Sequence, residues 1–112
     1  KCMHEFVISL ENLKKEKGVT ALDIAKAMLD YGIHPPTMYF PLIIHEALMV
    51  EPTETETKET LDEVIAIYKE IYQEAIDHPE TMQEFPRKAF IGRPDEVTAA
   101  RNPVLRYKYK LE

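Results

Sequence analysis

The sequence predicts an α+β fold, a two-layer sandwich in which a small, mostly antiparallel sheet of about three strands is covered by helices. The first observation is the order of patterns along the chain: strand, helix, strand, strand, helix, and then a trailing segment. The second is that both helical segments carry apolar residues on one face, so each can bury that face against a sheet. With 112 residues the chain has the size of one domain with one core.

Composition excludes several classes of protein. A formal net charge of −6 argues against nucleic-acid binding, because affinity for phosphates comes mostly from Lys and Arg. No apolar run approaches the roughly 18–20 residues that span a bilayer, and the N-terminal stretch lacks the features of a secretory signal. Cys2 is the single cysteine, so no internal disulfide can form. We therefore expect a cytoplasmic protein with neither nucleic-acid nor membrane partners.

The first element is a strand within "HEFVISLE", where the apolar residues Phe6, Ile8 and Leu10 stand at every second position, the spacing that puts side chains on one face of a strand. The following "NLKKEKG" is interpreted as a polar turn. Because the chain begins at Lys1 and enters this strand almost at once, we expect it to be part of a longer protein.

The next element is a helix that begins at Thr20, because Thr20 and Asp23 have the spacing of a capping box. Gly32 lies where a left-handed residue closes a helix, so we expect about three turns. The predicted apolar stripe of this helix is Leu22, Ala25, Met28 and Leu29, with Asp23, Lys26 and Asp30 off it.

A strand pair is predicted after the His34-Pro35-Pro36 corner, which cannot continue a helix. The segments "TMYFPLII" and "EALMVE" are typical of strands. Pro41 cannot donate a hydrogen bond to a neighbouring strand, so it indicates an edge strand or a bulge.

The second helix begins at about Thr57 and ends at His78-Pro79. It carries the most pronounced amphipathic pattern of the chain, formed by Leu61, Val64, Ile65, Tyr68, Ile71, Tyr72 and Ala75. We expect one domain over residues 1–112, with a βαββα core at 1–77, an irregular segment at 78–112 and a short helix at 95–101.

Metal binding and nucleophilic catalysis have little support. Cys2 and His4 lie too close together and too isolated to form a zinc site, which normally needs four ligands, so no metal site is expected. His45 and His78 are interpreted as surface residues. The chain has no G-x-S-x-G motif and no Gly-rich phosphate loop, so by itself it does not look catalytic.

Two charged segments each allow two interpretations. "EPTETETKE" contains Glu51, Glu54 and Glu56, which suit acid–base work or cation binding, but acids and threonines also suit the start of a helix, and we favour the latter. Glu51 is the acid that capping explains least. The basic and aromatic "RNPVLRYKYK" resembles some single-strand binders, although a solvated tail is the simpler interpretation.

Three segments, "DYGIHPPT", "MVEPTETE" and "AARNPVLRY", carry a family resemblance by their joint occurrence in this order. The chain resembles the C-terminal part of the P-protein family of the glycine cleavage system, the decarboxylating glycine dehydrogenases, at the end of subunit 2. The resemblance implies the α+β small C-terminal domain of a type I pyridoxal-phosphate enzyme. It also implies decarboxylation of glycine and transfer of the aminomethyl group to the lipoyl arm of the H-protein.

The resemblance implies partners as well: the large cofactor domain of the same chain, subunit 1, the H-protein and glycine. The family's cofactor lysine follows a histidine in the large domain, and none of the ten lysines here has that context. We therefore expect the isolated chain to bind no pyridoxal phosphate and to be inactive.

The resemblance also indicates a candidate active-site wall, formed by polar groups on two stiff corners: His34, Thr37, Glu51, Thr53 and Glu54. The alternative is that both corners serve only as turns and caps. A different class of function is a stand-alone, ferredoxin-like ligand-binding or dimerising module, which the βαββα order also allows.

Overall fold

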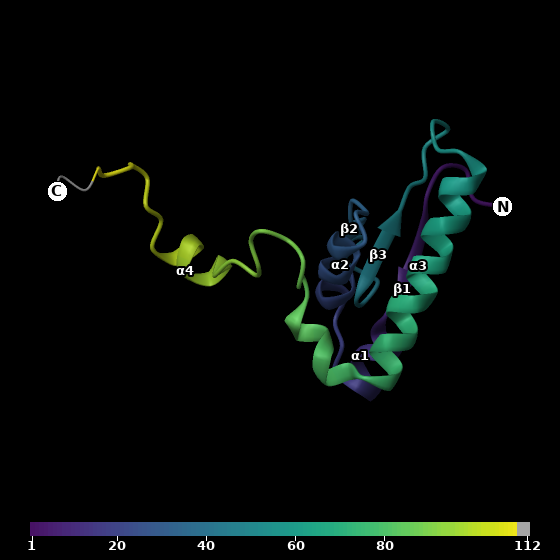
Figure 1. The fold of residues 1–112 in the computed structure, drawn as a ribbon, viewed down its shortest axis with the longest axis horizontal. Helices are drawn as coiled ribbons and strands as arrows, with labels where there is room; N and C mark the ends of the chain where they lie inside the picture. The colour runs from purple at the N-terminus through teal and green to yellow at the C-terminus, as the bar shows by residue number, and fades with distance from the viewer. Residues whose placement is uncertain (110–112) are drawn as a thin grey trace.

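The computed structural model describes residues 1–109 of the chain (Figure 1). In chain order its elements are β1 (Phe6–Ser9), α1 (Glu11–Lys17), α2 (Ala21–Asp30), β2 (Thr37–Met38), β3 (Ala47–Val50), α3 (Lys58–Asp77), the 3₁₀ helix η1 (Pro79–Glu84) and α4 (Glu96–Arg101). The predicted α+β architecture with a three-stranded antiparallel sheet is confirmed. The predicted 1–112 domain and its 78–112 segment both extend to residue 112, and their last three residues, which include the lysine at 110, lie outside the described residues.

The sheet has the strand order β1-β3-β2, so β3 is central. Its register aligns Ile8, Leu48 and Met38 in one row across the three strands. This row packs into the core together with residues from α2, α3 and η1, and Leu48 at its centre is 1% exposed. The inward-facing row therefore joins the sheet to its helical layer.

The segment "NLKKEKG" was wrongly interpreted as a turn, because residues Glu11–Lys17 form α1. Its residues favour a helix, and Glu11 and Lys15 form an i,i+4 ion pair at 2.6 Å. Leu13 is buried in the core, and Gly18 ends the helix with a φ of 75°. Burial of one leucine and a glycine cap stabilise a helix that the polar composition concealed.

Both predicted ends of α2 are confirmed. Thr20 Oγ1 accepts from the Asp23 backbone N–H at 3.2 Å, and the Asp23 carboxylate accepts from the Thr20 N–H at 2.9 Å, which completes the capping box. Gly32 has a φ of 73°, and the Ile33 N–H donates to the Met28 carbonyl at 3.1 Å. The chain therefore leaves α2 in a fixed direction toward the His-Pro-Pro corner.

The predicted stripe of α2 was wrong in part. Leu29 is 39% exposed, whereas Asp23, which we had placed off the apolar face, is 3% exposed. The helix contacts α3, η1 and β2, so its buried face is wider than a stripe against one layer. The buried residues of this helix are Ala21, Asp23, Ile24, Ala25, Ala27 and Met28.

The strand pair is confirmed, but β2 spans only Thr37–Met38 and residues 39–46 form a turn. Tyr39 and Glu46 bound this turn with φ values of 57° and 51°. Left-handed residues cannot continue a strand, which explains why "TMYFPLII" yields so short an element. Pro41 lies in the turn, next to a strand at the edge of the sheet.

The predicted second helix is confirmed as α3. Thr57 caps it, since its hydroxyl accepts from the Thr60 N–H at 3.2 Å, and His78 ends it. Ile71 and Ala75 of the predicted stripe are buried, whereas Ile65 is 52% exposed. The C-terminal half of the stripe thus carries most of the packing.

After α3 the chain packs against the body through η1 and Phe85, and then extends away from it (Figure 1). Within residues 1–109, no helix combines the length and apolarity that a bilayer crossing requires. In the same range, no three His, Cys, Asp or Glu side chains are grouped so that they could hold a metal ion.

Candidate functional site

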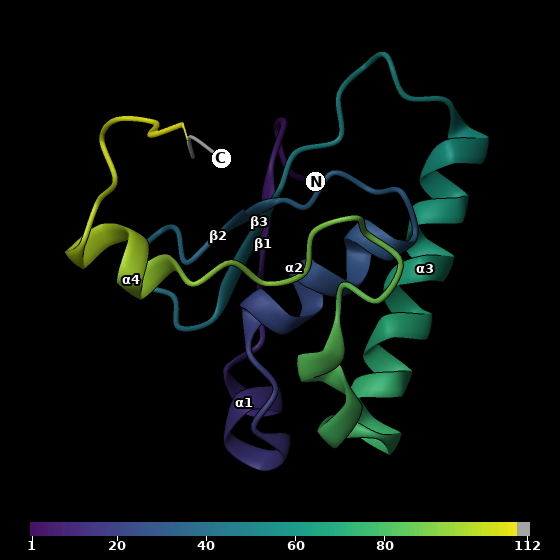
Figure 2. The same ribbon diagram turned by 60° about the vertical axis from the view of Figure 1, so that its left-hand side comes forward.

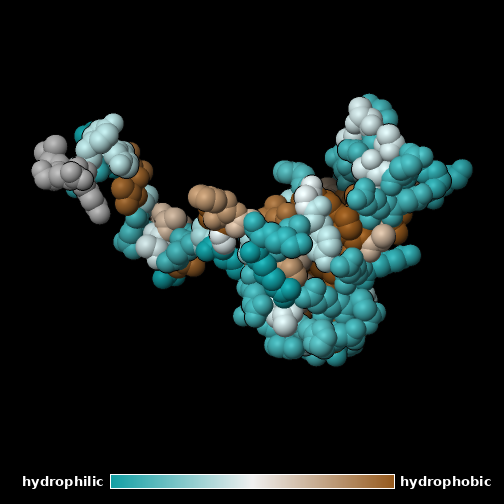
Figure 3. All heavy atoms as spheres, in the orientation of Figure 1, coloured by the Kyte–Doolittle hydropathy of each residue, from teal (hydrophilic) through white to brown (hydrophobic). Residues whose placement is uncertain are grey.

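A groove with a volume of about 690 Å³ opens between the 31–37 corner, the end of β3 and the N-terminal half of α3. Its partly buried apolar lining includes Ile33, Val50, Leu61, Val64 and Ile67. Figure 3 shows apolar residues gathered in the upper part of the body between hydrophilic surfaces. The groove thus combines an apolar floor with a polar rim, as ligand and partner sites commonly do.

Four of the five predicted wall residues line this groove: His34, Thr37, Glu51 and Thr53. Glu54 is not among the lining residues, although Glu56 from the same corner is. The structure therefore brings the two corners together across one hollow. Whether they form an active-site wall remains a prediction.

The Glu/Thr corner also contains the turn and cap chemistry of the simpler interpretation. Thr53 and Thr55 are joined through their hydroxyl groups at 2.7 Å, and the Glu56 N–H donates to the Thr53 carbonyl at 3.1 Å. Thr57 then caps α3. The threonines build the corner, which leaves Glu51 and Glu56 exposed at the groove.

Besides the imidazole of His34, the groove is lined by three carboxylates. Glu51 and Glu56 come from the corner and Glu63 comes from α3, and no Lys or Arg is among the lining residues. Three exposed carboxylates around one hollow give it a negative potential. Such a groove attracts cationic groups and disfavours a phosphate.

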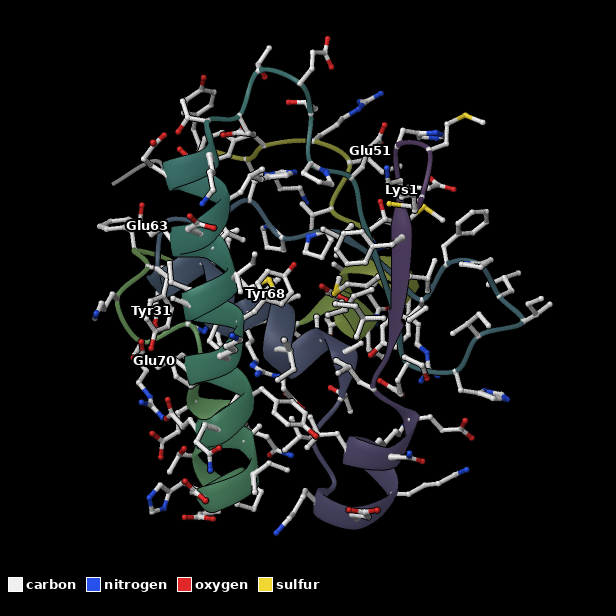
Figure 4. The ribbon with its side chains drawn as sticks, turned by 90° about the vertical axis from the view of Figure 1, so that its right-hand side faces the viewer. Lys1, Tyr31, Glu51, Glu63, Tyr68 and Glu70 are labelled. Atoms are coloured by element: carbon white, nitrogen blue, oxygen red, sulfur yellow. The ribbon has the colours of Figure 1, made fainter. Side chains whose placement is uncertain are left out.

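Two tyrosines of the groove were not predicted as site residues. Tyr31 donates a hydrogen bond to Glu70 Oε1 at 2.7 Å, and this bond, with partial burial, raises the pKa of Tyr31 to about 12. Burial also raises the pKa of Tyr68, which Figure 4 shows on the side of α3 facing the rest of the domain. Both phenols remain neutral hydrogen-bonding groups at physiological pH. The signals available in the sequence were the position of Tyr31 just before Gly32 and the helical spacing of Tyr68.

A second polar cluster, away from the groove, has a structural role. The buried Glu46 carboxylate accepts from the Ala21 backbone N–H at 2.7 Å and from Lys14 Nζ at 2.5 Å. It thereby joins the 39–46 turn to α1 and to the start of α2. His45 is exposed, as predicted, and its carbonyl accepts from the Ser9 hydroxyl at 2.9 Å.

Residues 1–91 match the family model described as the glycine dehydrogenase C-terminal domain. A protein of Treponema denticola is 61% identical over 107 residues, and one of Fervidobacterium nodosum is 59% identical over 107 residues; each match covers 96% of this chain and 22% of the relative. A protein of Thermosipho melanesiensis is 55% identical over 111 residues, covering 99% of this chain and 23% of the relative. All three carry the name "Probable glycine dehydrogenase (decarboxylating) subunit 2".

The chain thus spans between a fifth and a quarter of the length of these curated relatives. Family match and identity agree with the resemblance carried by the His-Pro-Pro and Glu-Pro-Thr corners, whose residues meet at the groove. The chain belongs to the glycine dehydrogenase C-terminal domain family.

Proposed function

We propose that this chain is the C-terminal domain of a pyridoxal-phosphate-dependent glycine decarboxylase, the P-protein of the glycine cleavage system. The observation that carries the proposal is the family match over residues 1–91, together with 61% identity to a relative named for glycine dehydrogenase. In this proposal the complete enzyme decarboxylates glycine and passes the aminomethyl group to the lipoyl arm of the H-protein. Subunit 1 is its further partner, and the assembly is cytoplasmic.

The role of this domain is to form one wall of the active site. The wall is the groove, because its rim places His34, Thr37 and Glu51 on two corners whose backbone is restricted by prolines. Positioned polar groups of this kind hold a reacting molecule more firmly than groups on a mobile loop. The acidic rim suits an amino group, and the apolar floor suits an aliphatic arm.

Pyridoxal phosphate itself does not fit the groove. The lining residues include no lysine to bond its aldehyde and no cation to balance its phosphate, while Glu51, Glu56 and Glu63 would repel that phosphate. We therefore assign the cofactor to the large domain of the complete protein. Pyridoxal phosphate acts as an electron sink in carbanion chemistry, and the present chain would position groups around that centre.

The stand-alone module has less support. A ferredoxin-like fold has the element order βαββαβ and therefore four strands. Residues 1–109 contain a sheet of only three strands, and an additional helix, α1, follows the first strand. The match to one end of longer relatives also favours a domain of an enzyme.

Exchange of the glycine carboxyl group with labelled bicarbonate tests the proposal. The complete polypeptide, assembled with subunit 1, the H-protein and pyridoxal phosphate, should catalyse the exchange, and the isolated 112-residue chain should not. The isolated chain should also form no internal aldimine on titration with pyridoxal phosphate. An assembled enzyme without exchange activity, or a borohydride-reducible aldimine in the isolated chain, would contradict the proposal.

A further inference from the structure

Residues 94–109 form an extended segment, named here the C-terminal arm. Figures 1 and 2 both show it on the side of the molecule opposite α3, leading away from the body. Every residue of the arm is exposed, including those of its helix α4. Its large apolar side chains and their exposed fractions are Val97 61%, Val104 87%, Leu105 87%, Tyr107 80% and Tyr109 82%.

So many adjacent apolar side chains are unusual on the surface of a free monomer. Single exposed apolar residues are common, but clusters of this kind mark interaction sites. Leu105, Tyr107 and Tyr109 alternate with Arg106 and Lys108 in a non-helical stretch. The chain bends at Arg106, and beyond the bend the rings of Tyr107 and Tyr109 pack edge to face with their centroids 4.9 Å apart, so the two side chains form one continuous apolar face.

The root of the arm is anchored to the body. Arg93 Nη1 forms an ion pair with the buried Asp23 carboxylate at 2.7 Å. Its Nε donates to the Phe85 carbonyl at 2.7 Å, and its Nη2 donates to the Met82 carbonyl at 3.1 Å. All these partners lie in the packed body, so the arm starts from a point that is fixed to the body.

We propose that the C-terminal arm packs, by its apolar face, onto the part of the same polypeptide that precedes this domain. The inference rests on the proposed function, in which this chain ends a longer enzyme. The Thermosipho melanesiensis relative matches 99% of the present chain, which includes the arm, and this match covers 23% of that relative. The large remaining part of such a polypeptide supplies the surface that the arm lacks here.

The size of the arm favours a partner in the same polypeptide. A stable interface between separate proteins buries roughly 800 Å² and about 20–30 residues on each side. The arm offers sixteen residues, and only some of them can face a partner. A covalent connection raises the effective concentration of the two surfaces to the order of millimolar, so a small apolar face suffices.

Photo-cross-linking in the complete polypeptide, assembled with subunit 1, tests the occupant. p-Benzoylphenylalanine replaces Tyr107 in the arm and, as a matched control, the half-exposed Tyr72 of α3. Irradiation of the arm variant should join residue 107 to peptides that precede this domain, without an increase in the mass of the polypeptide. A product with twice that mass, a product with subunit 1, or the absence of any arm-specific product would overturn the proposal.

Hydrogen exchange of the complete polypeptide provides the second test. Leu105→Glu with Tyr107→Glu should speed exchange of residues 94–109 at least tenfold and leave residues 6–85 unchanged, because the arm has no part in their core. Lys17→Glu, an exposed change in α1, should affect neither segment. Fast exchange of the arm already in the unaltered polypeptide would overturn the proposal. Both readouts are independent of glycine turnover, so the arm and the proposed function can fail separately.

Discussion

The two halves of α3 differ in what their apolar residues do. In the C-terminal half, Ile71 is 1% exposed and Ala75 is 0% exposed, both within the core. In the N-terminal half, Leu61 and Val64 belong to the same predicted stripe but line the open groove, half-buried. One amphipathic pattern thus forms the packed core at one end of the helix and lines an open groove at the other.

Truncating side chains along α3 should give the largest difference between the two halves. Ile71→Ala should lower the free energy of unfolding by about 2–5 kcal/mol, because it leaves a cavity in a packed core. Val64→Ala should cost under about 1 kcal/mol, since its side chain is half in solvent. Urea unfolding of the 112-residue chain measures both, and equal losses would show that the groove half is packed as tightly as the core half.

The next largest loss of stability is expected from removing Arg93, which anchors the C-terminal arm to the body. Arg93→Met removes the guanidinium and leaves the buried Asp23 carboxylate with Thr20 as its remaining partner. We expect the free energy of unfolding to fall by about 1–3 kcal/mol, the usual cost of a buried polar group that loses a partner. Arg101→Met, in the exposed arm, is the control and should change the urea midpoint little. Equal midpoints for both variants would argue that the arm has no fixed root.

The smallest effect concerns pH. Partial desolvation of the Asp30 carboxylate alone would raise its pKa. The carboxylate also accepts hydrogen bonds from the backbone N–H groups of Arg87, Lys88 and Ala89, and these outweigh the desolvation, so the pKa of Asp30 lies below its usual value. A lowered folded-state pKa gives stability that is present above the unfolded value, about 3.9. That stability is lost as the pH falls through the lower folded value.

Asp30→Asn should therefore flatten the dependence of the unfolding free energy on pH below about pH 4, relative to the unaltered chain. Asp62→Asn, at an exposed position on α3, serves as the comparison. Urea midpoints measured from pH 6 down to pH 3 supply the data. Identical pH profiles for the unaltered chain and Asp30→Asn would contradict the assignment.

Local patterns in the sequence were enough for the caps and for α3. Thr20 with Asp23, Gly32 and Thr57 each act within one helical turn, so spacing alone locates them. The turn interpretation of "NLKKEKG" failed because the polar composition hid two features that stabilise α1 beside its i,i+4 ion pair, the burial of Leu13 and the glycine cap at Gly18.

Contacts over a long sequence distance could not be predicted. Asp23 was placed off the buried face of its helix because its partner Arg93 follows seventy residues later, after two strands and two helices. The sequence predicted two polar corners as a candidate wall but not the groove between them, which Tyr31 and Tyr68 join only through the packing of α2 against α3. Glu54 was placed on the wall with its neighbours, yet it does not line the groove.

The measurement that tests the central claim most directly is the effect of His34→Ala in the complete enzyme. Glycine–bicarbonate exchange and the melting temperature are measured on one preparation, with His78→Ala, an exposed histidine outside the groove, as the matched control. If the groove is an active-site wall, His34→Ala should slow exchange more than tenfold, because the loss of one positioned hydrogen-bond donor raises an activation barrier by about 2.7–4 kcal/mol. The melting temperature should shift by only a few degrees. Unchanged exchange with lowered melting would assign His34 to the turn and contradict the account.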